Sequence, residues 1–209
     1  MSRALRWGFA REGITGGKLQ GTWRFGSMNV VLIGFSGCGK SSVGRALAGQ
    51  LGWEFVDTDA EVERTAGRRI HEIFAEEGEA TFRMLERSAV ESALRGEHRV
   101  VAVGGGAVVD PTNRQAIREG NLVVLLDANV DIIQARLERA MGEEPRPMLA
   151  KGGAERIASL KAARDPVYRE TAHVTIATDD ATVEEVTLLV AEAVRRVQAG
   201  LEMGATREL

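Results

Sequence analysis

One run of eight residues has the composition of a phosphate-binding loop. Gly34-Phe35-Ser36-Gly37-Cys38-Gly39-Lys40-Ser41 fits the pattern G-x-x-x-x-G-K-[ST], in which a glycine-rich backbone turns its N–H groups toward a nucleotide phosphate. In this pattern the lysine bridges the β- and γ-phosphates and the serine hydroxyl is a ligand of Mg²⁺. The alternative is a plain glycine-rich turn. An apolar stretch (30–33) before the run and a helix-like stretch (42–51) after it favour a nucleoside triphosphate site.

Two acidic residues, Asp57 and Asp59, follow the next short apolar stretch, residues 54–56. Because the carboxyl ends of parallel strands meet at one edge of a sheet, we expect these carboxylates to lie near the phosphate loop. One of them can hold Mg²⁺ through water while the other faces a substrate hydroxyl. For Asp59 the simpler alternative is the ordinary preference of acidic side chains for the first turn of a helix.

Two further groups have side chains or backbone suited to a ligand. Arg83 and Glu86 are three residues apart in a helical pattern and therefore share one side of that helix. An exposed ion pair is the simpler interpretation of this spacing. Gly104, Gly105 and Gly106 follow an apolar stretch, and three glycines in a row let backbone N–H groups approach a ligand closely.

The elements that position these residues alternate between short apolar stretches and longer amphipathic ones, which is typical of a parallel sheet covered by helices. We predict an α/β fold with helices between five strands, at residues 30–34, 54–56, 99–103, 122–126 and 173–176. Thr58 and Glu61 have the spacing of a capping box, and Asp110 followed by Pro111 suits a helix N-terminus. Residues 142–153, rich in glycine and proline, are expected to form an exposed loop.

Composition excludes several classes of protein. Of the 209 residues 44% are hydrophobic and 27% charged, which is ordinary for a globular domain and unlike a disordered chain. The net charge of −3 and the scattered basic residues predict no nucleic-acid partner. No uncharged apolar run approaches the roughly 20 residues of a membrane helix, so we expect no membrane partner. A single cysteine, Cys38, excludes an internal disulfide and favours the reducing cytoplasm.

The two ends of the chain differ from its centre. Residues 1–27 carry five basic residues and one acidic residue, and the composition changes at Met28. We interpret 1–27 as a basic, disordered extension or as sequence before a true start at Met28; a loose similarity to an organelle transit peptide is the alternative. Residues 28–198 are predicted to form one domain and residues 199–209 a tail.

The motifs in their chain order resemble shikimate kinase. Beside the phosphate loop and Asp57-Thr58-Asp59, the resemblance rests on Phe82-Arg83, Gly104-Gly105-Gly106-Ala107, Arg146-Pro147-Met148-Leu149 and Arg164-Asp165-Pro166-Val167-Tyr168. It extends from about Met28 to Val197. It implies a P-loop domain of the nucleoside-monophosphate-kinase type, with a five-stranded parallel sheet in the order 2-3-1-4-5. It also implies a substrate-binding region at about 58–95 and a mobile lid at about 142–153.

The implied reaction is transfer of the γ-phosphoryl group of MgATP to the 3-hydroxyl of shikimate, a step of aromatic amino acid biosynthesis. By this resemblance Asp59 contacts the accepting hydroxyl, Arg83 and Arg164 grip the substrate carboxylate, and Arg146 closes over ATP. Lys40, Asp59 and Arg146 are the expected catalytic residues, and Ser41 and Asp57 the Mg²⁺ contacts. The expected ATP contacts are Gly37, Cys38, Gly39, Lys40, Ser41, Ser42, Arg139 and Arg146. The expected shikimate contacts are Asp59, Arg83, Gly104, Gly105, Gly106 and Arg164.

Departures from the family pattern and two rival functions stay open. The run Thr178-Asp179-Asp180-Ala181 replaces the asparagine or arginine that the family often has near adenine, so the adenine contacts are open. One rival is a kinase of the same fold for another small metabolite, such as gluconate. The other is a nucleotide-binding regulatory module without catalysis. We expect a monomer with the small-molecule substrates shikimate and ATP.

Overall fold

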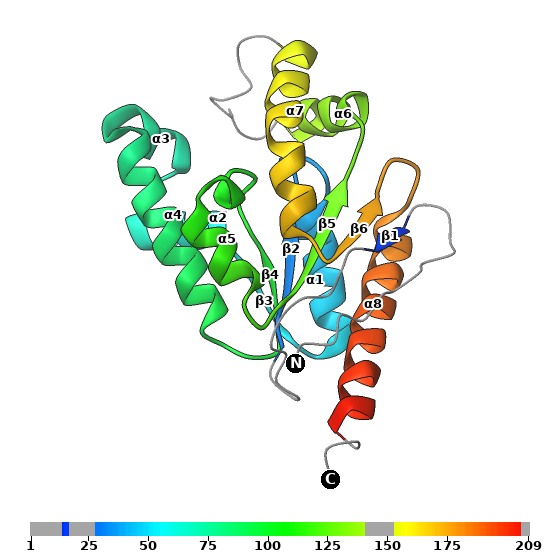
Figure 1. The fold of residues 1–209 in the computed structure, drawn as a ribbon. Coiled ribbons are helices and arrows are strands. Elements are labelled where there is room, and N and C mark those ends of the chain that lie inside the picture. The colour runs from blue at the N-terminus through cyan, green and yellow to red at the C-terminus, as the bar shows by residue number, and fades with distance from the viewer. Residues whose placement is uncertain (1–13, 17–27, 141–152, 206–209) are drawn as a thin grey trace.

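The structure is a computed structural model that describes residues 14–16, 28–140 and 153–205. A six-stranded sheet forms its centre, and helices cover both faces of this sheet (Figure 1). The strands are β1 (Ile14–Gly16), β2 (Val30–Ile33), β3 (Glu54–Asp57), β4 (Arg99–Ala102), β5 (Leu122–Asp127) and β6 (Val174–Ala177). The helices are α1 (Lys40–Leu51), α2 (Thr58–Ala66), α3 (Ile70–Glu76), α4 (Gly78–Leu94), η1 (Ala107–Val109), α5 (Pro111–Arg118), α6 (Val130–Ala140), α7 (Gly153–Thr171) and α8 (Val183–Ala205).

Five of the strands, β2 to β6, are parallel and lie in the order β3-β4-β2-β5-β6. Counted along the chain, this is the predicted order 2-3-1-4-5. The central strand β2 is buried along its whole length, and β5 is buried except at its last residue. Such strands are rich in valine, leucine and isoleucine because helices cover both faces of a parallel sheet. The predicted α/β fold with five parallel strands is therefore confirmed.

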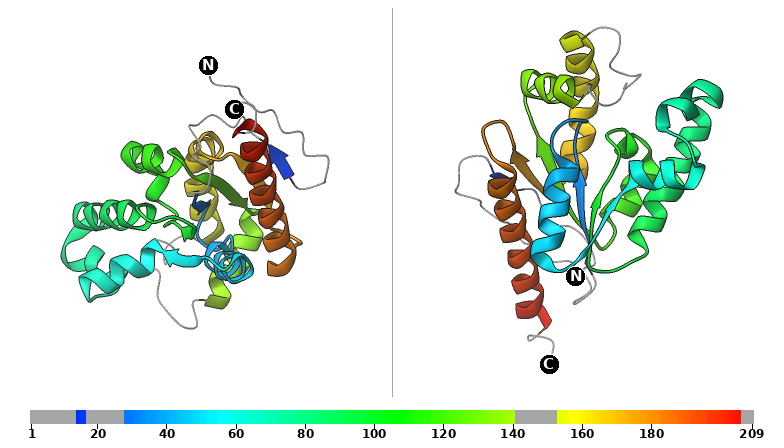
Figure 2. Two further views of the ribbon diagram at one scale, coloured as in Figure 1. Left: turned by 90° about the horizontal axis from the view of Figure 1, so that it is seen from below. Right: turned by 180° about the vertical axis from the view of Figure 1, so that it is seen from behind.

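Different sets of helices cover the two faces of the sheet. Helices α1 and α8 lie together on one face of the sheet, and α4, α5 and α7 lie on the other (Figure 1, Figure 2). Helices α2 and α3 pack against α4 and project beyond the end of the sheet (Figure 1). This projection has a small hydrophobic core of its own, made of Val62, Ile73, Phe82 and Ala89. It lies within residues 58–95, where the resemblance predicts the substrate-binding region.

The sixth strand, β1, pairs antiparallel with β6 at the edge of the sheet, with Ile14 opposite Ile176 and Gly16 opposite Val174. The expectation that residues 1–27 are disordered is therefore wrong for Ile14–Gly16. Three residues with one apolar side chain carry no periodicity, so their pairing depends on the exposed edge of β6 rather than on a local pattern. Residues 1–13 and 17–27 lie outside the described residues.

The predicted lid and the predicted C-terminal tail are only partly covered by the described residues. The expected lid, 142–153, lies outside the described residues except for Gly153, which begins α7. Arg146 lies in this stretch. At the other end, α8 continues to Ala205, so residues 199–205 of the predicted tail are helical.

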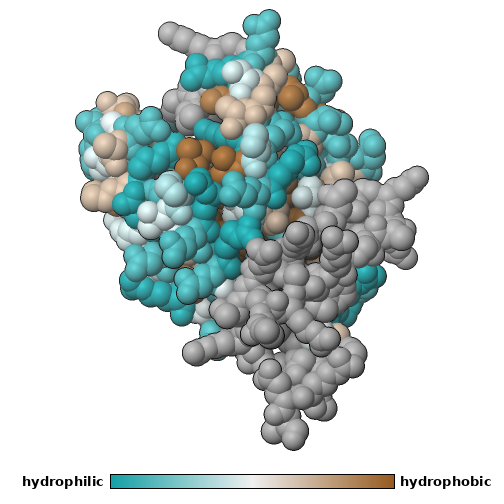
Figure 3. All heavy atoms as spheres, viewed as in Figure 1, coloured by the Kyte–Doolittle hydropathy of each residue, from teal (hydrophilic) through white to brown (hydrophobic). Residues whose placement is uncertain are grey.

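The surface drawn in Figure 3 is largely hydrophilic, and its hydrophobic residues form small groups rather than one broad patch. Four large hydrophobic side chains are exposed among the residues whose burial is described: Met84, Val109, Val183 and Leu188. Scattered residues of this kind are ordinary for a protein surface. Within the described part of the chain, no helix has the length and apolar character needed to cross a membrane.

Candidate active site

The phosphate loop connects β2 to the first turn of α1, as the motif predicts. Gly34 has a φ of +140°, and a Cβ there would lie 2.3 Å from the Leu126 carbonyl oxygen. The loop can therefore follow this path next to β5 only with glycine at this position. The Lys40 ammonium donates to the carbonyl oxygens of Gly34 at 2.9 Å and Phe35 at 3.0 Å. Its charge is held at the centre of the loop, where a phosphate would lie.

Asp57 links the phosphate loop to the neighbouring strand. Its Oδ2 accepts a hydrogen bond from the Ser41 hydroxyl at 2.6 Å, and its Oδ1 accepts one from the Asp59 N–H at 3.1 Å. Asp57 is thus the N-cap of α2. The predicted capping box of Thr58 and Glu61 is wrong, because Thr58 is already the first residue of the helix. Its buried hydroxyl instead accepts a hydrogen bond from the Gly104 N–H at 3.0 Å.

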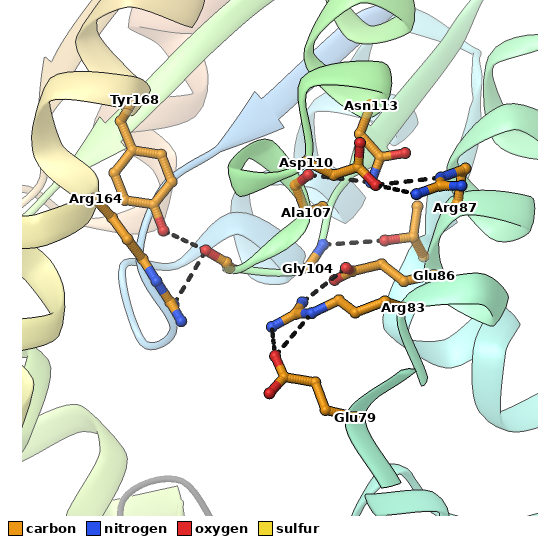
Figure 4. Close-up of polar contacts among 12 residues, drawn as sticks. Glu79, Arg83, Glu86, Arg87, Gly104, Ala107, Asp110, Asn113, Arg164 and Tyr168 are labelled. Carbon is orange, nitrogen blue, oxygen red and sulfur yellow. Dashed lines mark hydrogen bonds and ion pairs between the residues drawn. The ribbon is translucent and has the colours of Figure 1, made fainter. Parts of the chain in front are cut away.

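Arg83 from α4 lies between two carboxylates (Figure 4). Its Nη1 contacts Glu86 Oε2 at 2.8 Å and its Nη2 contacts Glu79 Oε1 at 3.0 Å. The interpretation of Arg83 and Glu86 as an exposed pair is wrong, because Glu86 is only 2% exposed. Burial raises the pKa of the Glu86 carboxyl, and the nearby Asp59 charge raises it further, while the Arg83 guanidinium opposes both.

The glycine run after β4 lies against the carboxylates of Asp59 and Glu86. A Cβ at Gly104 would lie 2.5 Å from Asp59 Oδ1 and 3.0 Å from Glu86 Oε1. Glycine at this position lets both carboxylates keep their places. The run ends in η1, whose Ala107 carbonyl accepts a hydrogen bond from the buried Asn113 side chain at 3.1 Å (Figure 4). The predicted N-cap Asp110 accepts from the Thr112 N–H at 2.8 Å, with Pro111 in the first turn of α5.

Helix α7 brings a second arginine to the same place. The Arg164 Nη1 donates to the Gly105 carbonyl oxygen at 3.3 Å, and the Tyr168 hydroxyl donates to the same oxygen (Figure 4). The Arg164 guanidinium also lies 5.6 Å from the centre of the Phe35 ring, within the range of a cation–π contact. A Cβ at Gly106 would lie 2.7 Å from Arg83 Nη1. Arg83 and Arg164 therefore reach the glycine run from two different helices.

One cavity of about 690 Å³ is lined by most of the predicted site residues. Its lining includes the predicted residues Gly37, Cys38, Gly39, Lys40, Ser41, Ser42, Asp57, Asp59, Arg83, Gly105, Gly106 and Arg164. Gly104 is buried next to this lining. A phosphate loop and two guanidinium groups at one cavity can hold a phosphate donor and a carboxylated acceptor side by side.

Sequence reasoning missed one arginine of the lining. Arg136 of α6 lines the cavity and donates to the Thr178 hydroxyl oxygen at 3.1 Å and to the Thr178 carbonyl oxygen at 2.6 Å. Arg139 is exposed and does not line the cavity, because three residues of a helix turn it about 60° away from Arg136. Its contact with adenine stays a prediction. The position of Thr178 directly after β6, at the carboxyl edge of the sheet, is the signal that could have indicated this region.

Comparisons with known proteins agree with this geometry. A family model described as shikimate kinase matches residues 36–195. The shikimate kinase of Symbiobacterium thermophilum is 44% identical over 178 residues, which cover 85% of this chain and 100% of that relative. The shikimate kinase of Geobacter sulfurreducens is 43% identical over 185 residues, which cover 86% of this chain and 100% of that relative.

A solved structure of shikimate kinase from Acinetobacter baumannii in complex with shikimate superposes with a TM-score of 0.78. It is 34% identical, and the match covers 83% of this chain and 96% of that one. The family model covers the phosphate loop from Ser36 onward, both arginine-bearing helices and the glycine run. Sequence, fold and cavity lead to one conclusion: the chain belongs to the shikimate kinase family.

Proposed function

We propose that this chain transfers the γ-phosphoryl group of ATP to the 3-hydroxyl of shikimate, giving shikimate 3-phosphate and ADP. The observation that carries the proposal is the single cavity in which the phosphate loop faces Asp59, Arg83 and Arg164. A phosphoryl transfer needs its donor and acceptor held in line, with charge stabilised between them. The named relatives and the shikimate complex of the Acinetobacter enzyme support this assignment.

On the nucleotide side, the phosphates would lie over the first turn of α1, where Gly37, Gly39 and Ser42 line the cavity. Backbone N–H groups at a helix start attract anions. The Lys40 ammonium would leave its two carbonyl partners to contact the transferred phosphoryl group. Arg146 would close over ATP from the lid, and Arg139 would contact adenine.

Mg²⁺ fits the donors at the boundary between the two sides. The Ser41 hydroxyl and the Asp57 carboxylate are hard oxygen ligands held 2.6 Å apart, and Mg²⁺ prefers such oxygens together with water and phosphate. No group of three or more acidic, histidine or cysteine ligands gathers for a metal among the described residues. Ser41 would hold the ion directly and Asp57 through water. When bound, the ion neutralises phosphate charge.

On the acceptor side, Arg83 and Arg164 would bind the shikimate carboxylate from α4 and α7. A planar guanidinium suits a carboxylate because it offers paired N–H donors. The backbone of Gly104, Gly105 and Gly106 would contact the ring of the substrate. Asp59, at the start of α2, would accept the proton of the attacking hydroxyl, as a general base does.

We also propose that the enzyme acts as a monomer in the cytoplasm. One chain supplies all the described residues of the proposed site. Light scattering during size-exclusion chromatography tests the monomeric state, for which a mass close to 22.6 kDa is expected.

The proposed reaction is tested by measuring ADP release from MgATP with shikimate, with gluconate or without an acceptor. We expect ADP release that depends on shikimate and does not rise with gluconate. Stimulation by gluconate instead would support a kinase for another metabolite with the same fold. No stimulation by either acceptor, while calorimetry shows ATP binding, would support the regulatory module.

A further inference from the structure

We propose that Tyr168 is a positioning residue that holds the Gly105 carbonyl in place while Arg164 turns to the substrate carboxylate. The inference deepens the proposed function and rests on it. Figure 4 shows Arg164 and Tyr168 one helical turn apart on α7, with dashed lines from both meeting at one carbonyl oxygen. This carbonyl oxygen belongs to Gly105, in the middle of the glycine run.

Tyr168 has the properties of a fixed donor. Its side chain is only 1% exposed, and it is among the largest fully buried side chains of the described residues. Burial raises the pKa of the Tyr168 hydroxyl above its ordinary value, so the hydroxyl keeps its proton and can donate it. A buried ring in a helix has little freedom to turn, so this hydrogen bond stays in one place.

Arg164 is a movable donor, because it has two possible partners: the Gly105 carbonyl and the substrate carboxylate. It is longer and more flexible, and it donates to Gly105 from a distance of 3.3 Å. If its guanidinium binds the substrate carboxylate, the N–H groups that face this carboxylate are no longer available to the peptide. A carbonyl oxygen has two lone pairs and can accept both donors, so Tyr168 can stay bound when Arg164 leaves.

The glycine run needs such a support at its centre. Its beginning is held by the bond from the Gly104 N–H to Thr58, and its end by the bond from Asn113 to the Ala107 carbonyl. Between these points, a Cβ at Gly105 would lie 3.1 Å from the Ser36 backbone nitrogen of the phosphate loop. A shift of the Gly105 peptide would therefore disturb both the acceptor contacts and their distance from the phosphates.

Without the Tyr168 hydroxyl, Arg164 could either donate to the Gly105 carbonyl or bind the substrate carboxylate, but not both. A partly buried carbonyl that loses its donor is costly, so substrate binding would be opposed by this loss. We expect Tyr168→Phe to raise the KM for shikimate about 5- to 10-fold, which is the size of one net hydrogen bond. The KM for ATP and kcat are expected to stay within about twofold of wild type.

The control variant is Thr171→Val on the same helix. Thr171 is also 1% exposed, and its hydroxyl donates to the Val167 carbonyl of its own helix at 2.6 Å. Both variants remove one buried hydroxyl from α7, so urea unfolding should show a similar loss of stability. Only Tyr168→Phe should raise the KM for shikimate. A general weakening of α7 would raise this KM in both variants and would overturn the inference.

A substrate analogue separates the role of Arg164 from a simple change of shape. The methyl ester of shikimate lacks the negative carboxylate that draws Arg164 away from Gly105. For this ester, kcat/KM of Tyr168→Phe should lie within about twofold of wild type, because Arg164 keeps its place on Gly105. An equal loss for the ester and for shikimate would overturn the inference.

A further readout needs no substitution, because Tyr168 is the only tyrosine among the 209 residues. Protein made with 3-fluorotyrosine therefore gives a single ¹⁹F signal from this position. Departure of the Arg164 charge should shift this signal when shikimate is added, whereas the methyl ester should not shift it. A signal that does not respond to shikimate would overturn the inference.

These outcomes are distinguishable from failure of the proposed function. If wild-type protein shows shikimate-dependent ADP release and Tyr168→Phe has the wild-type KM, only the positioning role is wrong. If wild-type protein shows no such release, the proposed function is wrong, and the positioning role is overturned with it.

Discussion

The acceptor side of the cavity is built from side chains of two helices, α4 and α7, whereas the phosphate loop holds its lysine with its own backbone. Arg83 and the buried Glu86 form an ion pair at 2.8 Å, and α7 adds Arg164 and Tyr168 at the Gly105 carbonyl. By contrast, Lys40 contacts the Gly34 and Phe35 carbonyl oxygens of its own loop.

This difference predicts that the acceptor side selects its substrate more strictly than the phosphate loop does. Arg83 is already paired with the buried Glu86 before substrate binds, so an acceptor without a carboxylate offers the two guanidinium groups no further partner and should be rejected. The phosphate loop must exchange internal hydrogen bonds for bonds to phosphate, which any nucleoside triphosphate can provide. Variants on each side should therefore affect different kinetic constants.

The largest effect is expected for Asp59→Asn. The amide cannot accept the hydroxyl proton as a carboxylate does, so kcat should fall by about 10²- to 10⁴-fold. ATP binding, measured by calorimetry, should not change, because Asp59 lies on the acceptor side. Glu61→Gln on the same helix removes an exposed ion pair with Arg64 and should keep kcat. Turnover of Asp59→Asn close to wild type would remove Asp59 from the role of base.

The second prediction concerns the buried His173, which limits the pH range in which the folded protein is stable enough for kinetic comparison of the two sides. His173 is 1% exposed, and its Nδ1 accepts the Val123 N–H at 3.0 Å. Burial lowers its pKa from 6.5 to about 4, and the Arg118 charge adds to this shift. Below pH 6.5 the unfolded chain binds a proton at this histidine and the folded chain does not. Stability that is present above pH 6.5 is therefore lost as the pH falls to about 4.

The expected loss is about 3 kcal/mol of unfolding free energy over this range. Urea unfolding between pH 7 and pH 4 measures it. His173→Gln should remove this part of the pH dependence, whereas His71→Gln, in a partly exposed position of α3, should keep it. The same pH dependence in both variants would mean that His173 does not cause the acid sensitivity. Kinetic comparisons belong above pH 6.5.

On the phosphate side, Lys40→Met should weaken ATP binding about 30-fold, or about 2 kcal/mol, because a charged hydrogen bond is lost. Shikimate binding without nucleotide, measured by calorimetry, should keep its wild-type affinity. An equal loss of affinity for both substrates would contradict the separation of the two sides.

The smallest effect of the series tests the fixed pair on the acceptor side. Glu86→Gln keeps the shape but replaces a charge-assisted hydrogen bond to Arg83 by a weaker one, so the KM for shikimate should rise about fivefold, or about 1 kcal/mol. The matched control is Glu79→Gln, which changes the exposed partner of the same arginine. Its effect should stay within about twofold. Equal effects of the two variants would mean that burial adds nothing to the pair.

Local features could be predicted from the sequence. The phosphate loop is defined by consecutive residues. The five parallel strands follow from short apolar stretches, and their order follows from the resemblance alone. Asp57 and Asp59 lie at the predicted edge of the sheet, because the carboxyl ends of parallel strands coincide.

Features that depend on distant packing could not be predicted. The spacing of Arg83 and Glu86 is the same for an exposed and a buried pair, and the burial of Glu86 next to Gly104 decides between them. The choice between Arg136 and Arg139 depends on the rotation of α6 relative to Thr178, about forty residues later in the chain. Helix periodicity contains no information about such a rotation.

Strand β1 has a consequence for the behaviour of the protein in concentrated solution. A β6 edge without a partner would offer a row of N–H and C=O groups to the strands of other molecules, which is a common route to aggregation. Here Ile14–Gly16 occupies three of the four positions of β6. A chain that started at Met28 would leave that edge open, so this short segment lets the sheet end in its own sequence rather than in a neighbouring molecule.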